Sequence, residues 1–87
     1  MRALVVDDDE SCRAILSRFL AEFGEVEVRH DGAEATEAVR RAIEDSRPYD
    51  LVCLDIMMPK LDGLSALREI RSTEAEKKAA PAKVLMT

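Results

Sequence analysis

The sequence lacks three features: a run of lysines and arginines, a long apolar stretch, and cysteines at metal-binding spacing. The formal net charge is −5, so direct binding to nucleic acid is not expected. The apolar residues before Asp7 are too few for a signal peptide or a membrane span, and we expect a cytoplasmic protein that does not contact a membrane. Cys12 and Cys53 lie within apolar patterns, which predicts two small buried thiols rather than a disulfide.

The chain instead shows a strict alternation of strand and helix patterns over 87 residues, of which 47% are apolar. Asp9 or Ser11 is placed to cap the first helix, and Gly24 to end it. Alternation with short connections predicts one α/β domain over residues 1–87, with a parallel sheet covered on both faces. The expected strands are 2–6, 25–29, 51–54 and 83–87, and 25–29 is expected at an edge of the sheet with one solvent-exposed face. The expected helices are 11–23, 35–43 and 64–70, and the last is expected to continue as a solvated extension through 72–80.

Acidic residues directly follow two of the apolar strands. Asp7 and Asp8 come after the strand 2–6, and Asp55 comes after the strand 51–54. In a parallel sheet the carboxyl ends of the strands share one rim, where ligands bind. Three carboxylates at this rim raise one another's pKa unless a cation compensates, and Mg²⁺ prefers such oxygen ligands. Asp9 and Glu10 are better explained as acids that favour the start of the first helix.

An aspartate beside a bound divalent ion is suited to act as the nucleophile in phosphoryl transfer, forming an acyl phosphate. An acid directly after the apolar strand 51–54 is costly to desolvate without such a role. Thr87 ends the last strand on the same rim, where its hydroxyl group is placed to hydrogen-bond a phosphoryl oxygen. The pattern therefore indicates a metal-assisted phosphoaspartate site formed by Asp7, Asp8, Asp55 and Thr87.

Three segments, in this order, resemble the receiver domain of two-component response regulators, which has the CheY-like, flavodoxin-like fold. They are VVDDDE, LDIMMPKLDGL and KVLMT, and the resemblance covers essentially the whole chain. It implies the strand order 2-1-3-4 and makes Asp55 the phosphoacceptor. It makes Asp8 a direct Mg²⁺ ligand, Asp7 a ligand through water, and the backbone carbonyl of Met57 a further ligand. Thr87 would hydrogen-bond the phosphoryl group.

The resemblance also implies where the phosphoryl group comes from. A histidine kinase, a phosphotransfer protein or a small phosphodonor would supply it. The domain is then a phosphoacceptor, capable at most of self-phosphorylation and self-dephosphorylation, and not an enzyme that acts on a separate substrate.

The sequence departs from the family pattern after its fourth strand. A receiver normally has five strands and five helices, so we expect a truncated domain without the fourth helix, the fifth strand and the fifth helix. The family's phosphoryl-binding lysine and its aromatic switch residue would belong to that part. Lys83 is at the wrong end of its strand to replace the lysine. The resemblance implies that Lys60, in the loop after Asp55, points outward. We therefore expect impaired switching.

Two other functions remain open. One is a non-switching, dimeric protein–protein interaction module, because truncation would expose the edge strand 84–86 and apolar side chains of the first and third helices. The other is a phosphatase of the haloacid dehalogenase type. It ranks well behind, because such phosphatases have a second aspartate two residues after the first, and LDIMMP has none two residues after Asp55. The helix side chains expected to lose cover are Ile15, Leu16, Phe19, Leu64, Leu67 and Ile70.

Overall fold

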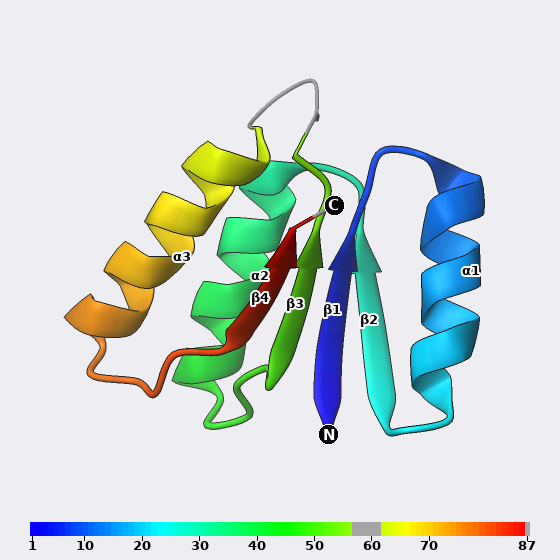
Figure 1. Cartoon of the computed structure of the whole chain (residues 1–87). Coiled ribbons are helices and arrows are strands. Elements are labelled where there is room, and N and C mark those ends of the chain that lie inside the picture. Colours follow the sequence, from blue (N-terminus) through cyan, green and yellow to red (C-terminus); the bar gives the residue numbers. More distant parts are fainter. Residues whose placement is uncertain (57–61, 87) are drawn as a thin grey trace.

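The computed structural model describes residues 1–56 and 62–86. Within that part, four parallel strands form one sheet in the order β2-β1-β3-β4, and three helices connect them (Figure 1). This confirms the predicted α/β fold class and strand order. The strands are β1 (Arg2–Val6), β2 (Glu25–Arg29), β3 (Leu51–Leu54) and β4 (Lys83–Met86), and the helices are α1 (Glu10–Ala21), α2 (Gly32–Glu44) and α3 (Gly63–Glu76).

The two central strands, β1 and β3, are buried on both faces, as their uninterrupted apolar sequences predict. Alternate side chains of a strand point to opposite faces, so the core has two halves. Figure 1 shows α1 on one side of the sheet, with α2 and α3 on the other. The half under α2 and α3 includes Leu4, Val6, Val52, Leu54, Ala66 and Ile70, and the half under α1 is formed by Ala3, Val5, Cys53 and Leu20.

Each helix begins directly after an aspartate that caps it. Asp9 precedes α1, Asp31 precedes α2 and Asp62 precedes α3, and each side chain accepts hydrogen bonds from the first turn of its helix. Such caps satisfy backbone N–H groups that have no partner inside the helix. The capping role predicted for Asp9 is therefore confirmed. None of the three helices in the described part is long and apolar enough to span a membrane.

Helix α1 differs from its prediction at its end and in which side faces the sheet. It ends at Ala21 rather than at Phe23, and Gly24 lies against Met1, where an added Cβ would be 2.1 Å from the carbonyl oxygen. Cys12 is exposed, so the prediction of a buried thiol was wrong for Cys12 and right for Cys53. The reason is the rotation of the helix, which turns Leu20 toward the sheet and Cys12 toward solvent.

The end of α3 is more buried than its polar sequence predicts. Glu74 is only 4% exposed, and its carboxylate accepts hydrogen bonds from Arg71 at 2.7 Å and from the backbone N–H of Ala82 at 2.8 Å. The expectation of a solvated extension over residues 72–80 was therefore wrong at Glu74. This carboxylate ties the end of α3 to the chain that enters β4.

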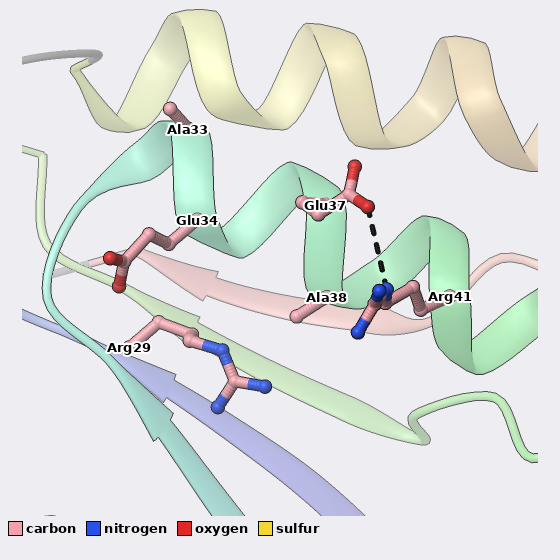
Figure 2. A pocket seen from close by; sticks show the side chains of 6 residues that line it. All are labelled: Arg29, Ala33, Glu34, Glu37, Ala38 and Arg41. Atoms are coloured by element: carbon pink, nitrogen blue, oxygen red, sulfur yellow. Dashed lines mark ion pairs between the residues drawn. The ribbon is translucent and has the colours of Figure 1, made fainter.

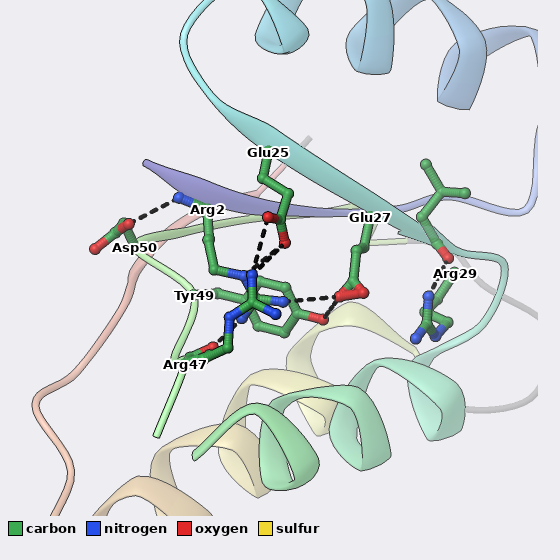
Figure 3. Close-up of polar contacts among 8 residues, drawn as sticks. Arg2, Glu25, Glu27, Arg29, Arg47, Tyr49 and Asp50 are labelled. Atoms are coloured by element: carbon green, nitrogen blue, oxygen red, sulfur yellow. Dashed lines mark hydrogen bonds and ion pairs between the residues drawn. The ribbon is translucent and has the colours of Figure 1, made fainter. Parts of the chain in front are cut away.

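The amino-terminal ends of β1 and β2 are joined by a polar network centred on Arg2 (Figure 3). Its guanidinium group pairs with Glu25 at 3.0 Å and Glu27 at 3.1 Å, and it lies 4.7 Å from the ring centre of Tyr49. The hydroxyl group of Tyr49 donates to Glu27, and burial, followed by that bond, raises the pKa of Tyr49 to about 12. These contacts leave Glu27 half-buried, although the alternating pattern of β2 predicts that Glu27 lies on a solvent-exposed face.

Candidate functional site

The carboxyl ends of β1 and β3 bring three aspartates together. Val6 is paired with Leu54 in the sheet, and the backbone N–H of Asp55 donates to the carbonyl oxygen of Val6 at 3.0 Å. Asp7 and Asp55 thus follow adjacent strand ends at the same height. Carboxylate oxygens of Asp7, Asp8 and Asp55 lie within 4.8 Å of one another. The acidic group of the sequence prediction is therefore present as one cluster.

The three carboxylates differ in their exposure to water. Asp7 is 7% exposed, Asp55 is half-buried and Asp8 is exposed. Burial raises the pKa of Asp7, a hydrogen bond from the backbone N–H of Asp9 lowers it, and the neighbouring Asp55 and Asp8 raise it again. A divalent cation would remove this repulsion, because hard ions such as Mg²⁺ bind several carboxylate oxygens at once. The donor set and its spacing fit Mg²⁺.

The raised pKa of Asp7 has a consequence for stability. Asp7 holds its proton in the folded chain at pH values where the unfolded chain, with a pKa near 3.8, has already released it. Without metal, the free energy of unfolding should therefore fall as the pH rises from below 3.8 through the raised pKa. Asp7→Asn should remove this part of the decline and be more stable than the parent at neutral pH.

Urea unfolding in the presence of a chelator, at a series of pH values, measures this effect. Asp45→Asn is the matched control, because Asp45 is exposed at the end of α2 and far along the chain from the cluster. A decline with pH that is equally steep in the parent and in Asp7→Asn would contradict the assignment.

Two contacts fix the loop that carries Asp7 and Asp8. The backbone N–H of Asp9 donates to the Asp7 carboxylate at 2.9 Å, and the guanidinium group of Arg13 donates to the Asp7 carbonyl oxygen at 2.7 Å. Sequence reasoning did not single out Arg13. Its position one helical turn after the cap at Asp9 is the signal that would have found it.

Gly63 holds the start of α3 against the backbone of the cluster. An added Cβ at Gly63 would lie 2.6 Å from the carbonyl oxygen of Asp55 and 2.8 Å from the Cα of Ile56. The backbone N–H of Gly63 also donates to the carbonyl oxygen of Ile56 at 2.9 Å. Only a glycine permits this approach.

Gly63→Ala should destabilise the chain by about 1–3 kcal/mol, because a backbone clash must be relieved by moving α3 or the loop after β3. Urea unfolding measures the loss. The control is Ser72→Ala, at an exposed position of the same helix, which should change stability by less than about 0.5 kcal/mol. Equal stability of Gly63→Ala and the parent would show that the close approach is not maintained.

Several predicted site residues cannot be placed. Met57, Lys60 and Thr87 lie outside the described residues, so the backbone carbonyl ligand and the hydroxyl group stay predictions. Lys83 is described and pairs with Leu51 at the amino end of β3, whereas Asp55 follows the carboxyl end. Lys83 is therefore at the opposite end of the sheet from the cluster, as expected.

A second surface feature is a hollow of about 460 Å³ between β2 and α2 (Figure 2). Its acidic side chains already have cationic partners or donors: Glu37 pairs with Arg41 at 3.5 Å and also with Arg40, and Glu34 bonds to His30 at 2.6 Å. The charges of this hollow are therefore locally balanced. The lining residues are Arg29, Ala33, Glu34, Glu37, Ala38 and Arg41.

Sequence comparisons relate the chain to bacterial signalling proteins. Residues 3–86 match the family model described as the response regulator receiver domain. The response regulator MprA of Mycobacterium avium (strain 104) is 50% identical over 74 residues, which are 84% of this chain and 30% of that protein. MprA of Mycobacterium leprae (strain TN) is equally similar, with 50% identity over 74 residues. The chain spans about a third of the length of these curated relatives.

Solved structures with the same fold include receiver domains. The receiver domain of the histidine kinase CKI1 from Arabidopsis thaliana, complexed with Mg²⁺ and BeF₃⁻, has a TM-score of 0.86 and 32% identity, covering 98% of this chain and 63% of that one. A co-crystal of the Saccharomyces cerevisiae phosphotransfer protein Ypd1 with the receiver domain of Ssk1 has a TM-score of 0.76 and 25% identity, covering 99% of this chain and 60% of that one.

Proposed function

Because this chain belongs to the response regulator receiver family, we propose that it accepts a phosphoryl group on Asp55 in a reaction that requires Mg²⁺. The observation that carries the proposal is the convergence of Asp7, Asp8 and Asp55 within 4.8 Å at the carboxyl ends of β1 and β3. A half-buried carboxylate beside two others is suited to act as a nucleophile next to a cation.

The proposed chemistry uses one oxygen of the Asp55 carboxylate. That oxygen attacks the phosphorus atom, the bond from phosphorus to the donor's nitrogen or oxygen breaks, and the donor leaves with the bonding electron pair. Asp8 and Asp55 would hold Mg²⁺ directly, Asp7 through water, and Met57 by its backbone carbonyl. When bound, the ion would neutralise charge shared between carboxylates and phosphoryl oxygens. Thr87 would hydrogen-bond the transferred group.

The donor is proposed to be a histidine kinase or a phosphotransfer protein, with small acyl phosphates as substitutes. Support comes from the similarity to the Ssk1 receiver domain, which was solved in complex with the phosphotransfer protein Ypd1. The name of the MprA proteins, response regulators, supports a role in the same kind of signalling.

We further infer that switching is impaired in this 87-residue chain. A phosphoryl group on Asp55 would need a nearby cation to offset its charge, and Lys83 lies at the other end of the sheet. Transfer to Asp55 should therefore be slow, and phosphorylation should couple weakly to a change of shape.

Intact-mass spectrometry after incubation with a small acyl phosphate tests the proposal. With Mg²⁺, one phosphoryl group per chain is expected, and with a chelator in place of Mg²⁺ none is expected. An unchanged mass in Mg²⁺ after prolonged incubation with excess donor would contradict phosphoacceptance by this chain.

A second candidate function is a non-switching, dimeric interaction module. The observation in its favour is the exposure of large apolar side chains: Ile15 is 67% exposed, Phe19 64% and Leu85 54%. Ile70 does not belong to this surface, because it is fully buried with Ala66 beside α2, and the prediction that it loses cover was wrong. The mass measurement separates the candidates, since a module that only binds would remain unphosphorylated.

A further inference from the structure

The carboxylate of Asp8, a proposed Mg²⁺ ligand, is held in place only through the backbone that carries it. Asp8 is exposed, and within residues 1–56 and 62–86 its side chain takes part in no hydrogen bond or ion pair. One of its oxygens nevertheless lies within 4.8 Å of carboxylate oxygens of Asp7 and Asp55. The direction of the Asp8 side chain therefore depends on the two peptide units that flank it.

Arg13, in the first turns of α1, contacts the chain on both sides of Asp8. Its guanidinium group donates to the Asp7 carbonyl oxygen at 2.7 Å, and this oxygen belongs to the peptide unit that enters Asp8. Its backbone N–H donates to the Asp9 carbonyl oxygen at 3.0 Å. The peptide unit that leaves Asp8 is held as well, because the backbone N–H of Asp9 donates to the Asp7 carboxylate at 2.9 Å. Asp8 thus lies between two fixed peptide units.

The charge of Arg13 works against a cation site at this place. A guanidinium group is always protonated in proteins, and this one contacts the backbone of Asp7, next to Asp8. Coulomb repulsion alone would therefore make Arg13 weaken the binding of Mg²⁺ to the cluster. Its hydrogen bond acts in the other direction, because a charged donor forms a stronger bond to a carbonyl oxygen than a neutral donor does. The two effects have opposite signs, so a measurement can separate them.

We propose that Arg13 is a positioning residue for the Mg²⁺ site. Its bond to the Asp7 carbonyl oxygen fixes the peptide unit before Asp8, and the Asp8 carboxylate then faces those of Asp7 and Asp55. The inference rests on the proposed function, since it takes Asp8 as an Mg²⁺ ligand. Mg²⁺ requires near-octahedral geometry with bonds of about 2.0–2.1 Å, whereas Ca²⁺ accepts irregular geometry and longer bonds. A misdirected Asp8 should therefore affect Mg²⁺ more than Ca²⁺.

Arg13→Met should weaken Mg²⁺ binding about tenfold and Ca²⁺ binding about threefold or less. Methionine keeps the aliphatic part of the side chain but cannot donate a hydrogen bond, so the peptide unit before Asp8 loses its fixed orientation. The removal of a positive charge alone would instead tighten the binding of both ions. Arg13→Lys keeps the charge and one donor group without the planar fork, and its Mg²⁺ affinity should lie between those of the parent and Arg13→Met.

Amide chemical shifts during Mg²⁺ and Ca²⁺ titrations give the affinities. Arg18→Met is the matched control, because Arg18 is exposed in the last turn of α1 and the substitution changes the net charge equally. Its affinities should equal those of the parent or be slightly tighter. Hydrogen exchange in a chelator gives a second, metal-free measurement: Arg13→Met should speed exchange of the Asp9 amide about fivefold or more, and exchange at Val5 inside β1 should change much less.

The outcomes separate this inference from the proposed function. A parent chain that binds no Mg²⁺ overturns the Mg²⁺-dependent function and the role of Arg13 together. A parent that binds Mg²⁺, with Arg13→Met binding it as tightly or more tightly, overturns the role of Arg13 alone. Equal weakening of Mg²⁺ and Ca²⁺ binding, with exchange at Val5 accelerated as much as at Asp9, would show a general loss of stability and overturn positioning.

Discussion

Asp8→Asn is expected to weaken Mg²⁺ binding by at least about tenfold and, without metal, to leave the fold no less stable than the parent. The two effects have one cause. Asp8 is the most exposed of three carboxylates whose oxygens lie within 4.8 Å, so its charge attracts a cation and repels Asp7 and Asp55 when no cation is bound. A residue that only stabilised the fold would show the opposite sign in the metal-free measurement.

Amide chemical shifts during an Mg²⁺ titration give the affinity, and urea unfolding in a chelator gives the stability. Asp9→Asn is the matched control, because it removes a neighbouring charge while asparagine keeps the cap of α1. It should change the Mg²⁺ affinity much less than Asp8→Asn does. Equal affinity of Asp8→Asn and the parent would show that the ion binds elsewhere.

Asp55→Asn is expected to abolish phosphoryl incorporation, from one group per chain to none. An amide has no anionic oxygen to attack phosphorus, and its loss also removes a proposed Mg²⁺ ligand. The fold should persist, because the contact that fixes Asp55 to β1 is its backbone N–H bond to Val6, which the substitution keeps.

The same acyl phosphate incubation, read by intact mass, measures this effect. Asp45→Asn serves again as the control and should incorporate as much as the parent, because Asp45 lies at the end of α2. Undiminished incorporation in Asp55→Asn would move the acceptor to another residue.

Much of the fold followed from the sequence because its strongest signals are local. Uninterrupted apolar runs are typical of strands buried on both faces, and Leu4 and Leu54 are indeed fully buried. Aspartates ahead of apolar periodic segments predict helix starts, as at Asp9. The acidic cluster followed from one further rule, that the carboxyl ends of parallel strands share a rim.

The differences lie where a side chain's environment is set by distant parts of the chain. Periodicity gave α1 an apolar side but not its rotation, which left Cys12 exposed. Glu74 is buried because the chain entering β4 presents the N–H of Ala82 to it, a contact eight residues away that no helical pattern encodes. The bond from Arg13 to the Asp7 carbonyl oxygen likewise depends on how α1 leaves the loop.

The prediction of which apolar helix side chains are exposed was right for some residues and wrong for another. Ile15 and Phe19 are exposed as expected for helix side chains that lack cover. Ile70 was expected with them but is buried, because α3 packs against α2 and encloses it with Ala66. The sequence pattern marks a residue as apolar, whereas the neighbour that covers it is decided by the packing of two helices.

The most direct test of the phosphoaspartate site is to locate the phosphoryl group itself. After incubation with Mg²⁺ and a small acyl phosphate, reduction with borohydride converts an aspartyl phosphate to homoserine, and peptide mapping finds the changed residue. The account predicts homoserine at position 55 alone, and only when Mg²⁺ is present. Homoserine at position 7 or 8, or equal modification of Asp55 in the presence of a chelator, would contradict it.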